Sequence, residues 1–157
     1  MSSEQRAREA LEASGISFTF TRHGPVGSLA EAALARGVRP EDIVKTIVVR
    51  TGAGDFLFVL VPGGRQISWP KLRALLGVNK MKLPSASEAH EVTGYERGTI
   101  TPFGSLTPLP VIADATITGR SISLGAGVHG VAATVDADAL IAVLGAQIAD
   151  VTQPEDA

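Results

Sequence analysis

The nine residues from Asp42 to Arg50 constrain the fold of this chain more than any other segment. β-Branched residues crowd this stretch and Pro40 precedes it, which is typical of a β-strand. Because side chains alternate along a strand, Lys45 falls on a face that it shares with apolar neighbours such as Ile47 and Val49. An ammonium group on such a face must extend to water or meet an anion. Two interpretations of Lys45 therefore stay open: a lysine that reaches solvent from a strand end, and a lysine that binds an anionic ligand in a cleft.

The composition indicates a folded protein with its own hydrophobic core. Of 157 residues, 45% are apolar and 19% are charged, which excludes an intrinsically disordered chain. The absence of cysteine excludes disulfides, thiol catalysis and cysteine-based zinc sites. No apolar run is long enough to cross a membrane and the first residues lack a signal-peptide pattern, so we expect a cytoplasmic protein. With a net charge of −2, any contact with nucleic acid must be local.

Capping and stop residues predict several helices. A serine or aspartate followed three residues later by glutamate often begins a helix, and glycine often ends one. The helices that these signals predict cover residues 3–14, 28–36, 68–76, 85–93 and 137–144.

Runs of β-branched and aromatic residues predict strands between these helices. The expected strands cover residues 16–21, 42–50, 56–61, 109–113, 117–124 and 128–135, with a further strand near Ile148. Hairpins outnumber crossovers in this order, so we predict an α/β fold of the α+β type, with a curved, mixed, largely antiparallel sheet flanked by helices. We expect a single domain over residues 1–157, with its core at about 16–145. Residues 94–110 have little periodicity, and a loop of this length in a compact domain is usually functional or mobile.

Three motifs in order carry a resemblance to a known family. They are the run from Asp42 to Val49, the run from Gly98 to Gly104, and the run from Gly125 to Gly130. Together they resemble the YbaK/prolyl-tRNA synthetase-associated editing domains, and shorter likenesses lie at His23–Val26 and Asp138–Leu140. The resemblance spans roughly residues 16 to 145. It implies an enzyme that hydrolyses the ester between a wrong amino acid and tRNA.

The resemblance also implies which residues do the chemistry. Attack of water on the ester creates an oxyanion, and backbone N–H groups of a glycine-rich loop can hold that charge. The loop Gly98-Thr99-Ile100-Thr101-Pro102 matches the family's GxxxP pattern, so we expect its amides to act there. Lys45 is expected to line the pocket and contact the terminal nucleotide. The family is thought to use a ribose hydroxyl of the substrate to position or activate the water.

Further residues are expected to bind the substrate. They are His129, Gly127, Gly125, Phe103, Gly104, His23 and Thr46. His129 has a second interpretation as a turn histidine that faces water, and some branches of the family lack a histidine here. The three histidines show no metal-ligand spacing, so we predict neither a metal nor a cofactor.

The expected partner is the acceptor end of a mischarged tRNA. Lys71, Arg73, Lys80 and Lys82 form a candidate basic edge for phosphates, although scattered solvated charge is an equally good interpretation. Trp69 and Tyr95 are the candidate rings for stacking on the terminal adenine, and a core position is an equally good interpretation of Trp69. An aminoacyl-tRNA synthetase is a candidate second partner, a membrane is not expected, and monomer and homodimer both stay open.

The amino acid that is removed is less well specified by the sequence. Branches of the resembled family act on alanyl, cysteinyl, seryl or threonyl esters. Pro102-Phe103-Gly104 and the Gly-x-His turn at Gly127 favour the alanyl type. Two alternatives remain: a non-catalytic module that binds tRNA or a nucleotide, and a structural partner of a synthetase. Lys45 together with the intact loop favours the enzyme over both.

Overall fold

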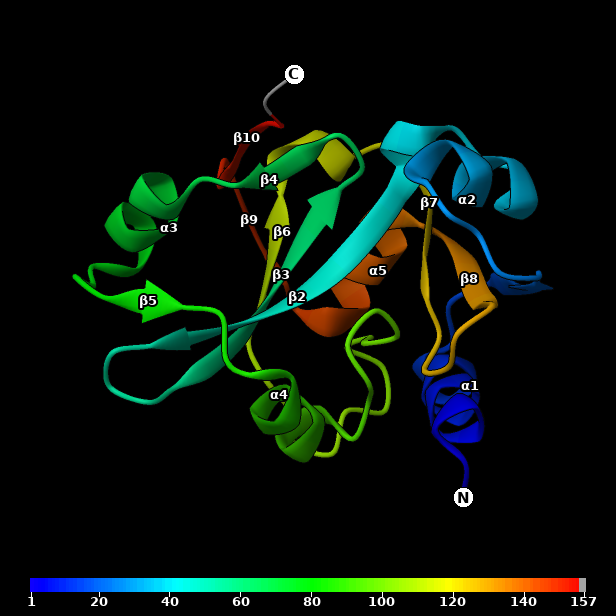
Figure 1. Cartoon of the computed structure of the whole chain (residues 1–157), viewed down its shortest axis with the longest axis horizontal. Coiled ribbons are helices and arrows are strands. Elements are labelled where there is room, and N and C mark those ends of the chain that lie inside the picture. The colour runs from blue at the N-terminus through cyan, green and yellow to red at the C-terminus, as the bar shows by residue number, and fades with distance from the viewer. Residues whose placement is uncertain (156–157) are drawn as a thin grey trace.

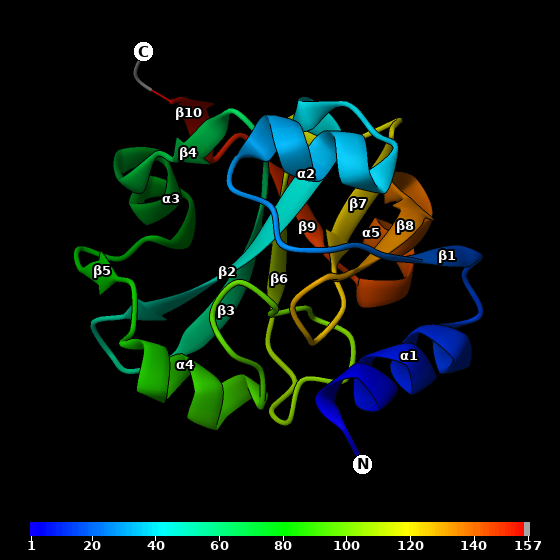
Figure 2. The same cartoon turned by 45° about the vertical axis from the view of Figure 1, so that its right-hand side comes forward.

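The protein is described by a computed structural model that covers residues 1–155, and its centre is a mixed eight-stranded sheet (Figures 1 and 2). The strand order is β1-β8-β7-β2-β3-β6-β9, and β5 pairs with one end of β2. The strands are β1 (Phe18–Arg22), β2 (Ile43–Thr51), β3 (Phe56–Pro62), β5 (Met81–Lys82), β6 (Val111–Asp114), β7 (Ser121–Gly125), β8 (Val131–Asp136) and β9 (Gln147–Ala149). A separate two-stranded sheet joins β4 (Arg65–Ile67) and β10 (Thr152–Pro154).

Five α-helices and two short 3₁₀ helices surround the strands in this part of the chain. The α-helices are α1 (Ser3–Ser14), α2 (Leu29–Arg36), α3 (Trp69–Leu76), α4 (Ala86–Thr93) and α5 (Ala137–Leu144). The 3₁₀ helices are η1 (Pro40–Asp42) and η2 (Ala115–Ile117). None of the helices described here is long and apolar enough to span a bilayer.

The predicted fold class is confirmed. Three strand pairs are parallel, β2 with β7, β3 with β6 and β6 with β9, and the remaining pairs are antiparallel. Helices lie on both faces of the sheet. Buried apolar residues form a larger core on one face of the sheet and a smaller core on the other. Residues of α1 and α5, including Leu11 and Leu140, belong to the larger core, whereas Leu72 of α3 belongs to the smaller core.

The two cores explain why β3 is apolar along its whole length. Phe58 and Leu60 point into the larger core, and Leu57, Val59 and Val61 point into the smaller one. A strand that is covered on both faces cannot alternate between apolar and polar residues. β2 divides its side chains in the same way, with Val44 and Val48 in the larger core.

Helix caps follow the predicted pattern at most helices. The side chain of Ser28 accepts a hydrogen bond from the N–H of Glu31, and Ser85 does the same for Glu88. Glycines in the left-handed conformation end each α-helix, as Gly37 does for α2. The exception is α3, because the Ser68 side chain makes no capping hydrogen bond.

Other boundaries differ from the sequence prediction. Asp42 belongs to η1 and not to the strand, so β2 begins at Ile43. The expected strand over 117–124 is shorter, because η2 and a turn at Gly119 occupy its first half and β7 begins at Ser121. No strand signal was found for β4, β5 and β10, which have two or three residues each.

Candidate active site

A cavity of about 360 Å³ lies along one edge of β2. On its other edge β2 pairs with β3 from Val44 to Arg50. On the cavity side β2 pairs with β7 only at Ile43 and Val44, and with β5 only at Arg50 and Thr51. The stretch from Lys45 to Val49 therefore has no strand partner on this side within residues 1–155. The residues that line the cavity are Arg36, Ile43, Val44, Lys45, Thr46, Ile47, Val48, Leu83, Pro84, Ala89, Arg97, Gly98, Ile100 and Gly125.

The unpaired edge turns backbone groups toward the cavity. Successive residues of a strand direct their N–H and C=O groups to opposite sides. The carbonyl of Ile43 accepts from Gly63 on the β3 side, whereas the N–H of Gly52 donates to Lys80 on the β5 side. Even-numbered residues therefore face the cavity side, which places the backbone groups of Thr46 and Val48 there. The Oγ1 of Thr46 is also buried and has no hydrogen-bond partner in the described chain.

Three cationic side chains line this cavity. Lys45 is half exposed, and its Nζ lies 4.0 Å from the Glu155 carboxylate. Arg36 reaches the cavity from the last turn of α2, and burial lowers the pKa of its guanidinium. Arg97 lies at the rim and donates to the carbonyl of Pro84. No Asp, Glu or His is among the described residues that line the cavity, so it is electropositive although the whole chain has a net charge of −2.

The loop from Gly98 to Pro102 forms the wall opposite β2. Gly98 has a φ of +91°, a left-handed conformation that favours glycine. The N–H of Thr99 donates to the Glu96 carbonyl, so it is already used within the protein. Gly98 and Ile100 line the cavity, and their N–H groups have no partner among the hydrogen bonds of residues 1–155. These two amides are therefore the candidate oxyanion donors of the loop.

The threonines and the proline of this loop do not line the cavity. Thr99 is buried, and its Oγ1 donates to the Glu96 carbonyl. Thr101 is buried as well, and its Oγ1 accepts from the N–H of Phe103. Pro102 has no N–H to donate. These residues shape the loop, which is a different role from the direct contact with the oxyanion that we expected of its amides.

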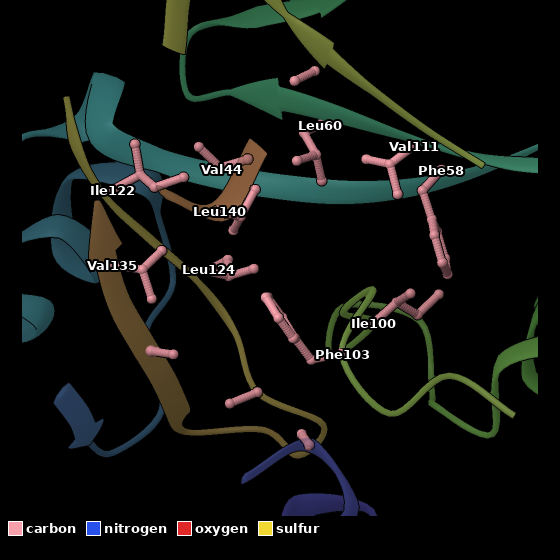
Figure 3. Packing of buried hydrophobic residues seen from close by; sticks show 14 of the residues in the cluster. Val44, Phe58, Leu60, Ile100, Phe103, Val111, Ile122, Leu124, Val135 and Leu140 are labelled. Atoms are coloured by element: carbon pink, nitrogen blue, oxygen red, sulfur yellow. The ribbon is translucent and has the colours of Figure 1, made fainter. Parts of the chain in front are cut away.

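The second half of the loop motif belongs to the core. In Figure 3 the Phe103 side chain points from the loop toward Leu124 and the Ile100 side chain points toward Phe58, and Phe103 is 4% exposed. Gly104 packs against the backbone of Arg6, where an added Cβ would lie 2.7 Å from the Arg6 carbonyl oxygen. Neither Phe103 nor Gly104 lines the cavity. The second half of the loop is therefore packed against the rest of the protein.

The two aromatic residues that we considered for stacking have other positions. Tyr95 is fully buried, its hydroxyl donates to the Phe103 carbonyl, and burial raises its pKa. Trp69 packs against the smaller core on the other side of the sheet. Neither ring lines the cavity, so the expectation that one of them stacks on the adenine is not supported by their positions.

His129 lies beside the cavity in a neighbouring hollow, together with Thr99 and Gly127. A Cβ on Gly98 would lie 3.4 Å from His129 Cε1, so the imidazole adjoins the loop. Its Nε2 is 3.6 Å from the Glu96 carboxylate and the side chain is largely exposed. His23 directly follows β1, its N–H donates to the Gly130 carbonyl of the turn between β7 and β8, and it lines neither hollow.

Sequence reasoning missed Arg36, Arg97 and the open edge of β2. Arg36 stands at the end of an amphipathic helix, where a basic residue is ordinarily explained by the helix dipole. Arg97 directly precedes the glycine of the loop motif, which is a signal that could have been used. The open edge was not detectable, because β5 is only two residues long and gave no strand signal.

Comparisons with known proteins agree with this geometry. The family model "Aminoacyl-tRNA editing domain" matches residues 23–143. A proline–tRNA ligase of Bacillus licheniformis is 31% identical over 93 residues, which are 59% of this chain and 16% of the ligase. A proposed Cys-tRNA(Pro)/Cys-tRNA(Cys) deacylase of Enterococcus faecalis, EbsC, is 24% identical over 82% of this chain and 79% of its own length. The chain thus spans about a sixth of the length of the ligase.

Solved structures with the same fold cover nearly the whole chain. The crystal structure of a proposed trans-editing enzyme for prolyl-tRNA synthetase has a TM-score of 0.87 at 28% identity, and the match covers 96% of this chain and 97% of that one. The hypothetical protein APE2540 has a TM-score of 0.86 at 27% identity, over 94% and 99% of the two chains. From the cavity, the loop motif and the match over residues 23–143, this chain belongs to the aminoacyl-tRNA editing domain family.

Proposed function

We propose that this protein is a trans-editing deacylase that hydrolyses the ester bond of a mischarged small amino acid on tRNA, with alanyl esters preferred. The observation that carries this proposal is the combination of a cationic cavity with a loop whose Gly98 and Ile100 amides are unused. An aminoacyl ester at the 3′ end of tRNA has both an adjacent phosphate and a carbonyl that becomes an oxyanion. The cavity therefore offers complementary groups for both parts of such a substrate.

The proposed reaction needs no nucleophile from the protein. The oxygen of a water molecule bonds to the ester carbonyl carbon, and the N–H groups of Gly98 and Ile100 hold the oxyanion that forms. The bond from that carbon to the ribose oxygen then breaks, and the proton that the water loses ends on this leaving oxygen. A ribose hydroxyl of the substrate orients the water, because the described lining residues include no carboxylate or imidazole as a base.

Selection of a small side chain would come from exclusion by the cavity walls. The alanyl preference rests on the sequence of the turn at Gly127 and of Pro102-Phe103-Gly104. The position of His129 beside Gly98 adds support, since that imidazole adjoins the place where the ester is expected. Because the relative from Enterococcus faecalis carries a cysteinyl assignment, cysteinyl-tRNA is the main competitor to include in a test.

The partners that we propose are the acceptor end of tRNA and an aminoacyl-tRNA synthetase that charges the same tRNA. Both follow from the relatedness to parts of proline–tRNA ligases. The proposed place of action is the cytoplasm, where tRNA is charged.

The test is a panel of mischarged tRNAs incubated with the purified protein. Alanyl, seryl, cysteinyl and threonyl esters on one tRNA are compared in single-turnover reactions. We expect the alanyl ester to be released fastest. Faster release of another ester would keep the deacylase and change its substrate. No release above the spontaneous rate for any ester would contradict the proposed function.

A further inference from the structure

Arg36 is a charged side chain inside the cavity that the protein itself does not neutralise. Its Nε is shielded from solvent and has no hydrogen-bond partner in the described chain. Its Nη1 donates a long hydrogen bond, 3.4 Å, to the hydroxyl of Ser123, which is fully buried. Among residues 1–155, no carboxylate lies within 4 Å of this guanidinium.

Other arginines of the protein are satisfied in ways that Arg36 is not. Arg22, Arg39, Arg50 and Arg120 each lie within 4 Å of a carboxylate, and Arg6 donates to the carbonyls of two glycines. A buried charge is costly unless it is paired and hydrogen-bonded. The end of α2 supplies only a partial negative charge to Arg36. The remaining donors of Arg36 therefore call for an anion that enters the cavity from outside.

The surroundings of Arg36 indicate which anion fits. Lys45 and Arg97 line the same cavity, so a ligand there meets three positive groups and no described acidic one. A guanidinium presents parallel donors that match two oxygens of a phosphate, and it stays charged at all physiological pH values. Arg36 reaches the cavity from α2, whereas Gly98 and Ile100 reach it from the loop. Figures 1 and 2 show α2 beside the start of β2 and the loop below this strand. The Arg36 guanidinium and the two amides that would hold the oxyanion therefore reach the cavity from different elements.

We propose that Arg36 binds the phosphodiester group on the 5′ side of the terminal adenosine and thereby positions the ester against the loop. This inference rests on the proposed function in that the ligand is the 3′ end of tRNA. Arg36 is a positioning residue in this scheme, because the group that it holds does not react. Lys45 supplies a second positive charge to the same phosphate from β2.

The experiment compares the binding of adenosine 5′-monophosphate and of adenosine, which differ only in the phosphate. By calorimetry or NMR titration, the wild-type protein should bind the nucleotide at least about tenfold more tightly than the nucleoside. Arg36→Gln should remove this preference and leave adenosine binding unchanged. Arg36→Lys keeps the charge without the paired donors and should retain part of the preference. Ser123→Ala, the matched control, removes the one hydrogen bond that Arg36 makes in the structure and should keep the preference.

Several results would overturn the proposal. They are equal binding of the two ligands by the wild type, a preference that survives in Arg36→Gln, and an equal loss of both ligands in Arg36→Gln. Thermal denaturation shows whether Arg36→Gln is folded. If it is not, the proposal is tested by the other two variants: Arg36→Lys should keep part of the nucleotide preference, and Ser123→Ala should keep all of it. These titrations involve no ester. A phosphate preference without any deacylation would therefore contradict the proposed function alone, and deacylation without the preference would contradict the role of Arg36 alone.

A kinetic comparison separates positioning from a structural role. Alanyl esters of adenosine and of adenosine 5′-monophosphate serve as minimal substrates. Arg36→Gln should lower kcat/KM at least about tenfold for the ester that carries the phosphate and leave it unchanged for the ester that lacks it. An equal loss for both esters would assign Arg36 to the oxyanion or to the fold and overturn the proposal.

Discussion

For Lys45, both the sequence and the structure leave two roles open: a lysine that only reaches solvent, and a lysine that binds an anionic ligand. Its side chain leaves an apolar strand, and in the structure it is half exposed, 4.0 Å from the Glu155 carboxylate, and lines the cavity. A pair as exposed as this one contributes only about 0–1 kcal/mol to stability. The position of Lys45 is therefore compatible with both interpretations, because its ammonium is exposed to water and also lines the cavity in which we propose that the phosphate binds.

Replacing Lys45 with Ala should lower the single-turnover rate of deacylation at least about tenfold, a loss of about 1.4 kcal/mol in transition-state stabilisation. The physical reason is the loss of a positive charge from the wall that faces the terminal nucleotide. Thermal stability should hardly change. Glu155→Gln is the matched control, because it removes the partner and leaves the lysine, and its rate should not fall. Unchanged kinetics in Lys45→Ala would show that the lysine only extends to solvent.

Gly98 is the second residue with a defined consequence. Gly98→Ala should cut the deacylation rate by more than tenfold, because alanine disfavours the φ of +91° that orients the cavity-facing amides. The nearest atom to an added Cβ is His129 Cε1 at 3.4 Å, so backbone strain and not a clash is the cause. The measurement is the single-turnover rate together with the free energy of unfolding.

Gly119→Ala provides the matched control for this change. Gly119 has a φ of +74° and no atom within 4 Å of an added Cβ, but it is not a lining residue of the cavity. Both variants should lose about 1–2 kcal/mol of stability from the left-handed conformation. Only Gly98→Ala should also lose activity. Equal activity in the two variants would remove the oxyanion role from the loop amides.

At the scale of elements, helices and strands differed in how well the sequence predicted them. Every α-helix within residues 1–155 was predicted, because glycine stops at all of them and capping side chains at all but α3 are local signals that packing did not override. The strands β4, β5 and β10 were missed, because they are held by partners far away in the chain, such as Thr152 opposite Ile67. Their residues have no alternating pattern of their own.

The site was predictable where a motif fixes backbone geometry and not where packing fixes it. The loop motif identified Gly98 and its neighbours, but it did not show that Ile100 and Phe103 anchor the loop in the core. Likewise, nothing in the pattern around Arg36 shows that its guanidinium ends inside a cavity. Such facts depend on how α2, β2 and the loop meet.

Asp114 joins several elements and makes stability depend on pH. It is buried at the end of β6, and its carboxylate accepts hydrogen bonds from the N–H groups of Thr116 and Val151. Burial alone would raise the pKa of this carboxyl, but hydrogen bonds from Thr116, Val151 and Thr152 outweigh it and hold the pKa below its ordinary value of 3.8. The lowered pKa means that the ionised form stabilises the folded state. This contribution is complete above about pH 4 and is lost as the pH falls through the lowered pKa.

Asp114→Asn should therefore lower the Tm at pH 7 and reduce it less at pH 3. The amide cannot accept on its nitrogen side, so at least one of the donors from Thr116 or Val151 loses its partner. Thermal denaturation over this pH range is the measurement. Asp55→Asn, in the exposed turn between β2 and β3, removes the same charge and should change the Tm little at either pH. A Tm difference for Asp114→Asn that does not depend on pH would contradict the assignment to ionisation.

At the scale of the whole molecule, positive charge is concentrated around one end of β2 although the net charge is −2. Arg50, Arg73, Lys80 and Lys82 surround a shallow hollow beside β5. Arg50 is paired with Glu88, whereas Arg73, Lys80 and Lys82 have no ion-pair partner among residues 1–155 and are the cations of this hollow that a ligand can meet. Lys71, which the sequence placed in the same basic edge, instead bonds Asp150 and the carbonyl of Thr152.

The hollow and the cavity are lined by consecutive residues of the chain. Lys82 ends β5, and the next two residues, Leu83 and Pro84, line the cavity. From Thr46 in β2 to Gly52, just after its end, the extended chain rises by roughly 3.3 Å per residue, or about 20 Å in all. That span corresponds to roughly six stacked nucleotides at about 3.4 Å each. An RNA strand whose 3′ end enters the cavity can therefore reach the basic hollow with phosphates of its acceptor stem.

Binding of uncharged tRNA should accordingly weaken with salt by a shallow slope, equivalent to about two or three phosphates. Replacing both Lys80 and Lys82 with Gln should weaken this binding and lower the slope by about one to two, because two phosphate contacts are lost. Replacing Arg8 and Arg22 with Gln removes the same charge from α1 and β1, which lie on the other side of the molecule from β5 and the hollow (Figure 2), and should leave the slope nearly unchanged. The measurement is the dissociation constant at several salt concentrations, with adenosine 5′-monophosphate as a ligand too short to reach the hollow. A loss of nucleotide binding in Lys80→Gln/Lys82→Gln, or equal slopes for the two double variants, would show that a general field and not a local contact attracts the tRNA.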